Sequence, residues 1–330
     1  DSSVISPSSE VLTRHFPLFA GKSVLLAGAI NDDFPAQLSA HCKSLQVWSF
    51  YFDYARQHAN VTFAEQFQGN ADLIVYYWSK NKAEVNFQLQ QLLAQAPIGQ
   101  EVLVIGENRG GIRSAEKQLA DYGDIGKIDS ARRCSLYHFT LQQRPNFDES
   151  RFWQRYQLPS LTICSLPGVF SAAALDDGTA LLLQTLDHLP QGDILDVGCG
   201  AGVIGATIKQ KKPQANLWMS DIHALALAST RKTLAENGLQ AEVLASDVFS
   251  EISAKFDLII SNPPFHDGLD TAYRAVNELI AQAKWHLRPG GELRLVANRH
   301  LAYADLLAQH FGHFEVLAQN NQFKVYSVTH

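Results

Sequence analysis

The stretch FDLIISNPPF, residues 256–265, decides how the rest of the chain is interpreted. Its first part, Phe256–Ser261, is a mostly apolar run typical of a strand buried on both faces of a parallel sheet. It leads directly into Asn262-Pro263-Pro264-Phe265, and ligands bind at the carboxyl ends of strands in open α/β sheets. We therefore interpret the tetrapeptide as part of a ligand site. The alternative is a turn that only ends a strand.

Strand and helix patterns alternate on both sides of this stretch. Apolar runs predict strands at Asp193–Val197, Asn216–Ser220, Ala241–Ala245, Phe256–Ser261 and Glu292–Ala297. Helices are predicted between them at Val203–Lys211, Leu225–Asn237 and Thr271–Leu287. Continuous apolar strands separated by helices indicate an α/β fold with a doubly wound parallel sheet. The tail predicts an antiparallel hairpin formed by Phe314–Ala318 and Phe323–Val328.

The first half of the chain repeats this order in a weaker form. The segments Val24–Gly28, Asp72–Ser79 and Val102–Gly106 correspond in order to Ile194–Gly198, Asp257–Pro264 and Leu293–Ala297. Three matches in one order indicate a duplicated domain. The first copy lacks the residues of the predicted ligand site, since Tyr77-Trp78 stand where the second copy has Asn-Pro. We predict a first domain over residues 1–145, a linker over 146–166, where Pro159 lies between Pro145 and Pro167, and a second domain over 167–330.

The loop DVGCGAG, residues 196–202, follows a predicted strand and opens a predicted helix. Gly198, Gly200 and Gly202 permit a tight turn and a close approach of the backbone to a ligand, which a dinucleotide site also needs. Asp196 favours S-adenosylmethionine (SAM), because a carboxylate attracts the ammonium of a methionyl group and repels a pyrophosphate. Asp221 ends the next strand, where its carboxylate can accept both ribose hydroxyls, although it would equally suit NAD.

Two residues after the third strand complete the predicted cofactor site. Asp247 closes that strand, and Val248 follows it. SAM-dependent methyltransferases commonly use an acidic residue at this place to accept the adenine amino group. The alternative for Asp247 is a cap of a helix or turn. The cofactor site predicted from the sequence thus consists of Asp196, Gly198, Gly200, Gly202, Asp221, Asp247 and Val248.

The tetrapeptide Asn262-Pro263-Pro264-Phe265 suits methyl transfer to a planar –NH2 group. Proline has no backbone N–H, so the carbonyl oxygens and the Asn262 side-chain oxygen are available to accept the two protons of such a group. Holding both protons aims the nitrogen lone pair at the SAM methyl, and positioning is then the main catalytic effect. Phe265 offers an aromatic face on which a base can stack, with core packing as the alternative.

These motifs together resemble the bacterial ribosomal RNA small subunit methyltransferase C family. Besides the two loops above, the resemblance rests on Pro167–Ser171 with Leu175–Gly178, on Gly106–Arg109 with Arg113–Glu116, and on Asp129–Cys134. It covers nearly the whole chain. The resemblance implies two tandem Rossmann-like SAM-methyltransferase domains, the first of them degenerate. It also implies SAM-dependent methylation of guanine N2 in 16S rRNA of the small ribosomal subunit.

Roles for further residues follow from the same resemblance. It implies that Gly178 and Thr179 contact the cofactor and that Phe170 shapes the pocket, unless Phe170 packs in the core. His266 and Asp267 would contact the base or the RNA, with a structural turn as the alternative. Phe323–Tyr326 would reach the target nucleotide, unless it is an ordinary strand.

A group of basic residues in the first half has two interpretations. Acidic residues are interleaved with them, so they form either phosphate contacts that set the register on RNA or a solvated face. The first domain would accordingly bind RNA or support the folding of the second. The group consists of Arg109, Arg113, Lys117, Lys127, Arg132 and Arg133.

Composition limits the class of protein. A hydrophobic share of 46% and a charged share of 18% are those of a soluble globular protein, and a net charge of −6 argues against a strongly basic RNA coat. We expect no membrane segment and no signal peptide, because neither pattern occurs. The four cysteines are far apart without a CxxC motif, so we expect no metal site and a cytoplasmic protein. We also expect a monomer.

Two other functions remain open at this stage. Asn-Pro-Pro-aromatic serves any planar –NH2 group, so methylation of adenine N6 or of a glutamine amide is one alternative. A SAM-binding assembly factor without catalysis is the other. The intact tetrapeptide argues against the assembly factor, because the first half of the chain shows what decay of the motif looks like.

Overall fold

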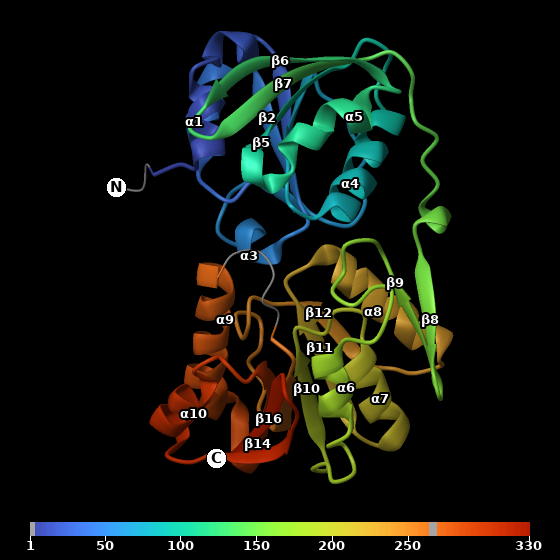
Figure 1. Ribbon diagram of the computed structural model, residues 1–330, viewed down its shortest axis with the longest axis vertical. Coiled ribbons are helices and arrows are strands. Elements are labelled where there is room, and N and C mark those ends of the chain that lie inside the picture. Colours follow the sequence, from blue (N-terminus) through green and yellow to red (C-terminus); the bar gives the residue numbers. More distant parts are fainter. Residues whose placement is uncertain (1–3, 264–268) are drawn as a thin grey trace. The chain divides into compact units, whose positions relative to one another are not determined.

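Two sheets with the same strand order organise the chain (Figure 1). The computed structural model describes residues 4–263 and 269–330, and these form two units that divide between Phe152 and Trp153. The sheet of the first unit has the order β3-β2-β1-β4-β5-β7-β6, and that of the second unit β12-β11-β10-β13-β14-β16-β15. In each, the first five strands are parallel, and the sixth strand in the order, β7 or β16, pairs antiparallel with both of its neighbours. The prediction of two tandem Rossmann-like domains is confirmed.

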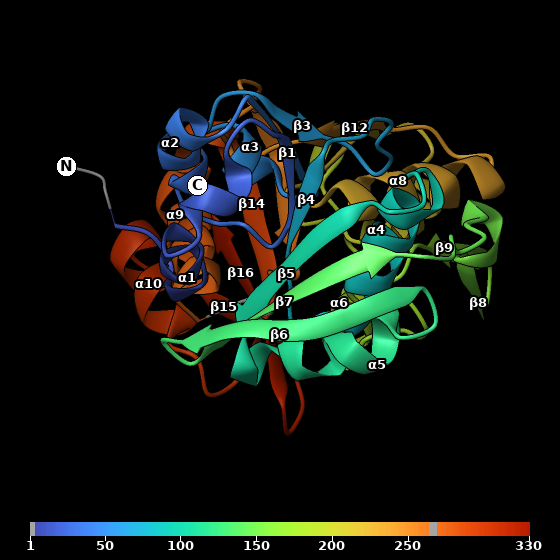
Figure 2. The same ribbon diagram turned by 90° about the horizontal axis from the view of Figure 1, so that it is seen from above.

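The first unit contains short helices and seven strands among its described residues (Figure 2). Its strands are β1 (Ser23–Gly28), β2 (Ser44–Ser49), β3 (Val61–Phe63), β4 (Leu73–Tyr77), β5 (Glu101–Glu107), β6 (Gly123–Ala131) and β7 (Cys134–Leu141). Its α-helices are α1 (Pro7–Thr13), α2 (Phe34–Leu38), α3 (Phe52–Ala55), α4 (Lys82–Ala94) and α5 (Ala115–Leu119). Short 3-10 helices lie at Phe16–Phe19, Ser39–His41, Asn108–Gly110, Ile112–Ser114 and Glu149–Arg151.

The second unit contains the predicted strands and helices, and four elements that were not predicted, namely β8, β9, α6 and α10. Its strands are β8 (Gln154–Leu158), β9 (Leu161–Ser165), β10 (Asp193–Val197), β11 (Asn216–Asp221), β12 (Glu242–Ala245), β13 (Phe256–Ser261), β14 (Leu287–Asn298), β15 (Glu315–Gln319) and β16 (Phe323–Thr329). Its α-helices are α6 (Asp177–Leu183), α7 (Val203–Lys211), α8 (Ala224–Glu236), α9 (Leu269–Gln282) and α10 (Tyr303–Phe311). The helix predicted to run to Leu287 ends at Gln282, and a 3-10 turn covers Ala283–His286.

The core of the second unit lies between its sheet and the helices. In Figure 1, α9 and α10 cover one face of the sheet, and α6 and α7 cover the other. Val276, Leu279, Ile280 and Ala283 recur at helical spacing and are almost fully buried. They pack with residues of β13 and β14 in one hydrophobic cluster. This packing holds the carboxyl ends of β10, β11 and β13 side by side at one edge of the sheet.

The predicted linker, residues 146–166, differs from the structure. It contains the antiparallel hairpin of β8 and β9, and β9 lies along α8. Two side chains of α8 and that of its C-cap residue are spaced four residues apart, so they lie on one helix face. Their oxygens accept hydrogen bonds from alternate backbone N–H groups of this segment. The pairs are Ser229 with Leu166 (2.9 Å), Thr233 with Cys164 (3.0 Å) and Asn237 with Thr162 (3.0 Å). The prolines indicated a linker, but a proline pattern does not reveal that distant hydroxyl and amide groups hydrogen-bond to this segment.

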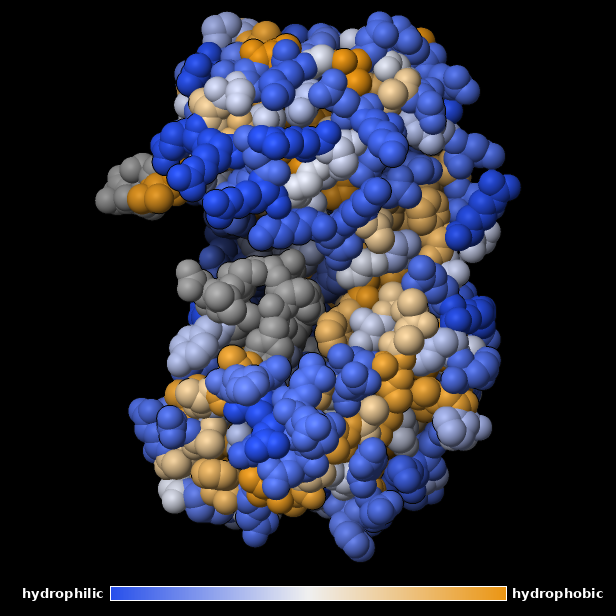
Figure 3. Space-filling model, viewed as in Figure 1, coloured by the Kyte–Doolittle hydropathy of each residue, from blue (hydrophilic) through white to orange (hydrophobic). Residues whose placement is uncertain are grey.

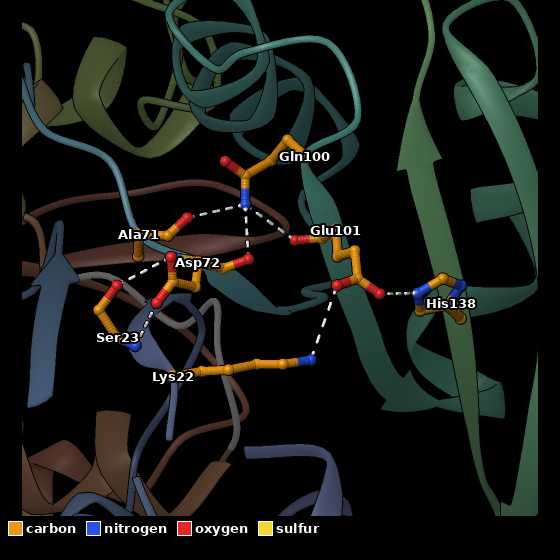
Figure 4. A network of polar contacts seen from close by, with 7 residues as sticks. All are labelled: Lys22, Ser23, Ala71, Asp72, Gln100, Glu101 and His138. Carbon is orange, nitrogen blue, oxygen red and sulfur yellow. Dashed lines mark hydrogen bonds and ion pairs between the residues drawn. The ribbon is translucent and has the colours of Figure 1, made fainter. Parts of the chain in front are cut away.

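A polar network ties the amino-terminal ends of the strands in the first unit (Figure 4). The carboxylate of Asp72 accepts from the backbone N–H of Ser23 at 2.9 Å, and Glu101 contacts both Lys22 and His138. The second unit repeats the first of these contacts, since Asp257 accepts from the backbone N–H of Asp193 at 2.9 Å. The two units therefore share a polar contact as well as a strand order.

The surface of the first unit is mostly hydrophilic in the view of Figure 3, including the region over β6, β7 and α5. The six basic residues singled out above are all exposed. Within the described part of the chain, no helix has both the length and the apolar character needed to cross a membrane.

Candidate functional site

The glycine loop after β10 makes a tight turn at the carboxyl edge of the second sheet. Gly198, Gly200 and Gly202 have φ angles of +72°, +54° and +92°, a region that residues with a Cβ rarely adopt. The backbone N–H groups of Gly198 and Cys199 both donate to the carbonyl of Ser220 at the end of β11, at 2.8 and 2.9 Å. Gly202 is the N-cap of α7. The loop therefore needs glycine for its shape, as its sequence predicted.

Asp196 lies at the base of this loop and is fully buried. Its Oδ2 accepts from the backbone N–H of Gly205 at 3.1 Å, whereas its Oδ1 is buried without a hydrogen-bond partner among the described residues. Burial raises the pKa of this carboxyl to about 7, and the nearby Asp221 adds to the rise. An unpartnered buried carboxylate oxygen fits a cationic ligand group such as an ammonium, because it lacks the counter-charge that would offset its desolvation.

Asp221 connects the end of β11 to the glycine loop. Its Oδ2 accepts from the backbone N–H of Gly200 at 2.9 Å, and its Oδ1 accepts from that of His223 at 3.0 Å. Each oxygen of an ionised carboxylate has two lone-pair sites, so both still have room for a further donor. The residue predicted only as a ribose ligand thus also holds the loop in place.

Asp247 and Val248 follow β12 at the same edge of the sheet. Asp247 is 5% exposed, and its Oδ1 accepts from the Arg274 guanidinium of α9 at 3.1 Å. Val248 has a φ of +53°, which is a strained conformation for a β-branched residue. Such strain persists where the surroundings impose it, and it clusters at functional sites.

Asn262 begins the predicted catalytic tetrapeptide at the end of β13. Its Nδ2 donates to Asp176 Oδ2 at 3.1 Å and to Thr179 Oγ1 at 2.8 Å. The residue before it, Ser261, is buried and donates through its hydroxyl to the carbonyl of Val197 at 2.7 Å. Pro263 is also buried. The other residues predicted to act here, Pro264, Phe265, His266 and Asp267, lie outside the described residues.

The residues to which the family resemblance gave further roles differ from one another in burial and contacts. Phe170 is 39% exposed, so it does not pack fully in the core. Phe323 lies beside Gly178, since a Cβ on Gly178 would be 3.2 Å from the Phe323 ring. Phe323–Tyr326 forms part of β16, which pairs with β14, and Tyr326 is 2% exposed. That segment therefore has at least the structural role that was its alternative.

Three supporting residues escaped the sequence interpretation. Thr230 of α8 donates to the carbonyl of Gly200 at 2.8 Å and so holds the glycine loop from the helix side. Arg274 contacts Asp247, and Asp176 contacts Asn262, as described above. Only Asp176 had a local signal, because Asp is a preferred helix N-cap residue and an apolar run follows it.

The first unit has different residues at the corresponding place. The β1–β4 register sets Tyr77 opposite Gly28, which is the place of Asn262 in the second unit. Tyr77 is buried, and its hydroxyl hydrogen-bonds the hydroxyl of Ser9 at 2.7 Å. Ile30 and Phe34, which follow Gly28, are buried in the hydrophobic core. Among the described residues of the chain, no group of three or more His, Cys, Asp or Glu is placed to hold a metal ion.

The second unit thus combines a doubly wound sheet, a glycine loop with a buried carboxylate oxygen that has no partner in the described part of the chain, and an anchored asparagine before proline. These features define a SAM-dependent methyltransferase domain, preceded by a domain of the same topology. The family model described as methyltransferase small domain matches residues 160–327. The model described as methyltransferase small domain N-terminal matches residues 9–156.

Curated relatives extend this match to almost the full chain. A ribosomal RNA small subunit methyltransferase C of Haemophilus influenzae is 66% identical over 328 residues, covering 98% of this chain and 99% of the relative. Proteins of the same name from Mannheimia succiniciproducens and Pasteurella multocida are 65% and 64% identical, with the same coverage. The chain belongs to the ribosomal RNA small subunit methyltransferase C family.

A solved structure has the same two-domain fold. It is the T. thermophilus 16S rRNA N2 G1207 methyltransferase (RsmC) in complex with AdoMet and guanosine, with a TM-score of 0.86. The match covers 98% of this chain and 92% of that one, at 24% sequence identity. At this identity the likeness shows the fold alone.

Proposed function

We propose that this protein transfers the methyl group of SAM to the N2 amino group of a guanine in 16S rRNA. The observation that carries the proposal is the anchored amide of Asn262 at the carboxyl end of β13. This strand is the sheet neighbour of β10, which leads into the glycine loop. The relatives that are 64–66% identical are named for a ribosomal RNA methyltransferase.

The cofactor residues would divide the recognition of SAM among them. The Asp196 carboxylate attracts the ammonium of the methionyl group. This assignment is supported by the buried Oδ1, for which the described residues provide no hydrogen-bond partner. Gly198, Gly200 and Gly202 let the backbone approach the ligand closely. The remaining lone pairs of Asp221 accept the ribose hydroxyls. Asp247 accepts the adenine amino group, and Val248 borders the adenine ring.

The acceptor groups would hold the guanine amino group in line with the methyl. Asn262 Oδ1 and the Pro263 carbonyl accept its two protons, which aims the nitrogen lone pair at the SAM methyl carbon. The nitrogen forms its bond to carbon as the carbon–sulfur bond breaks, and the sulfur leaves with the electron pair. The nitrogen then loses a proton to water, so the reaction needs no strong base. Phe265 would stack on the guanine ring.

We further propose that the first unit contacts RNA in the small subunit of a cytoplasmic ribosome. Arg132 and Arg133 form the turn between β6 and β7, and both have positive φ, at +53° and +61°. Asparagine and glycine are the residues that favour such turns, so two arginines here accept backbone strain. The exposure of both side chains supports a role in phosphate contact. We propose that the protein acts as a monomer.

A labelling experiment tests the proposed reaction. Small subunits that lack the modification are incubated with radiolabelled SAM, and the RNA digests are analysed by mass spectrometry. We expect N2-methylguanosine. Label in N6-methyladenosine or in protein would instead establish one of the alternative acceptors, and SAM binding without transfer would establish an assembly factor.

The role of Asn262 is tested by substitution. We expect Asn262→Ala to lower the transfer rate by orders of magnitude while SAM binding persists, because an acceptor of the amino group is lost. Asn216→Ala is a matched control, since Asn216 lies at the opposite end of the sheet, where its amide donates to Asp193 at 2.9 Å. Unchanged turnover in Asn262→Ala would remove this residue from the proposed site.

A further inference from the structure

We propose that Asp176 and Thr179 are positioning residues that fix the orientation of the Asn262 amide. Their contacts turn Oδ1 of Asn262, rather than Nδ2, toward the amino group that is methylated. The inference rests on the proposed function, which makes Asn262 an acceptor. It assigns to Thr179 a task different from the cofactor contact that the family resemblance implied.

The geometry admits one orientation of the amide. Both Asp176 Oδ2 and Thr179 Oγ1 are within hydrogen-bond distance of the same atom of Asn262, at 3.1 and 2.8 Å. An ionised carboxylate has no proton to donate, so the amide must present its –NH2 group to Asp176. Its oxygen therefore points to the other side. Thr179 is 6% exposed, and the contact is largely shielded from water.

This orientation matters because an amide is nearly symmetric in shape. A 180° turn about its last bond exchanges the oxygen and the –NH2 group with little steric change. An Asn262 turned in that way would present N–H donors to the N–H donors of the substrate. With both amide protons engaged, the correct form is held, and the polarised amide oxygen becomes a stronger acceptor.

The local structure also places Asp176 firmly. It is the N-cap of α6, and its Oδ2 accepts from the backbone N–H of Thr179 at 3.0 Å. The same oxygen therefore joins the helix cap to Asn262. Gly178 leaves room for it, since a Cβ at this position would be 3.1 Å from Asp176 Oδ2. One helix start thus delivers two acceptors to the end of a strand more than 80 residues away.

The first unit provides an internal comparison. Its helix α1 has Ser6 as N-cap, which accepts from the backbone N–H of Ser9 at 3.2 Å. The Ser9 hydroxyl bonds Tyr77, as the Thr179 hydroxyl bonds Asn262. A hydrogen bond between a helix hydroxyl and the residue at the strand end therefore occurs in both units. Among the described residues, the carboxylate at the cap and the amide it orients occur together only in the second unit, whose sequence keeps the Asn-Pro-Pro-Phe tetrapeptide.

Three single variants test the inference, and the first unit suggests the design of the first. Asp176→Ser keeps an N-cap residue like Ser6 but removes the carboxylate that reaches Asn262. Thr179→Val removes the hydroxyl while keeping the shape, and Thr179→Ser restores it. We expect Asp176→Ser and Thr179→Val each to lower kcat roughly tenfold, which is the scale of one lost charged or buried hydrogen bond. Thr179→Ser should rescue most of the loss.

Two further readouts separate positioning from a merely structural or cofactor role. The affinity for SAM by calorimetry and the melting temperature should stay close to those of the unmodified protein. In the Asn262→Ala background, Asp176→Ser should cause no further loss, because the group it orients is gone. A multiplicative loss in that background would overturn the inference.

The outcomes also separate this inference from the proposed function. If Asn262→Ala abolishes transfer but Asp176→Ser and Thr179→Val leave kcat unchanged, the positioning role fails and the proposed function stands. A weaker SAM affinity of Thr179→Val with normal kcat at saturating SAM would identify Thr179 as a cofactor contact and overturn its positioning role. Normal transfer by Asn262→Ala would reject the proposed function itself.

Discussion

Replacement of Asp196 by asparagine should remove a loss of stability that the unmodified protein shows as pH rises to neutral, and it should weaken SAM binding. Asp196 is fully buried, Oδ1 has no partner among the described residues, and burial raises the pKa of the carboxyl to about 7. Asparagine keeps an oxygen that can accept from the Gly205 N–H but carries no charge. The protein without SAM therefore bears a cost at neutral pH that the substitution Asp196→Asn would remove.

The size of this effect follows from proton linkage. In the unfolded chain the pKa of an Asp is 3.8. Between about pH 4 and pH 7 the folded protein holds a proton that the unfolded chain releases, so the free energy of unfolding falls as pH rises. A difference of about three pKa units corresponds to about 4 kcal/mol over the full window, and to about 2.5 kcal/mol between pH 5 and pH 8.

Urea unfolding of the two proteins without SAM, at several pH values, measures this difference. Any loss from the new amide, such as an unpartnered Nδ2, is independent of pH and shifts the whole curve without changing its slope. Between pH 5 and pH 8, the free energy of unfolding of Asp196→Asn should therefore rise by about 2.5 kcal/mol relative to that of the unmodified protein. Calorimetry at neutral pH should show at least a tenfold weaker affinity for SAM, because the charge partner of the ammonium is lost.

Asp193→Asn is a control of opposite sign at the other end of β10. Hydrogen bonds from Asn216 and Arg288 lower the pKa of Asp193, so its contribution to stability is present above the unfolded pKa and lost as pH falls. Asp193→Asn should therefore be less stable than the unmodified protein at neutral pH and approach it in acid. A pH-independent stability difference for Asp196→Asn would refute the raised pKa, and unchanged SAM affinity would refute the ammonium contact.

Three further outcomes are expected. Asp221→Ala should weaken SAM binding in calorimetry, since it removes ribose acceptors and an anchor of the glycine loop; an unchanged affinity would reject both roles. Arg294→Met should lower the free energy of unfolding in urea by about 3 kcal/mol, because Arg294 is 3% exposed and its removal leaves Glu292 without its buried partner; a loss below about 1 kcal/mol would contradict this reasoning. Reversal of Arg132 and Arg133 to Glu should weaken binding to small subunits and reduce its salt dependence, and an unchanged salt slope would exclude the turn as a phosphate contact.

The sequence by itself determined most strands of the second sheet, three of the helices that connect them, and the position of the site along the chain. The predicted bounds of β10, β13 and α7 coincide with the structure, because period and turn residues are local properties that a short segment carries alone. The glycine spacing of residues 198–202 likewise specified a loop with positive φ angles, since only glycine adopts them at low cost. The repeated order of the first half specified a second sheet of the same topology.

Only the tertiary structure decided which side chains meet. Asp176 and Thr179 reach Asn262, Thr230 holds Gly200, and α8 binds the edge of β9, all across long stretches of sequence. A hydroxyl or carboxylate has the same local pattern whether it caps a helix, faces water or orients a distant amide. The sheet topology determines which helix start lies beside which strand end, and such long-range contacts leave no periodic signal in a single sequence.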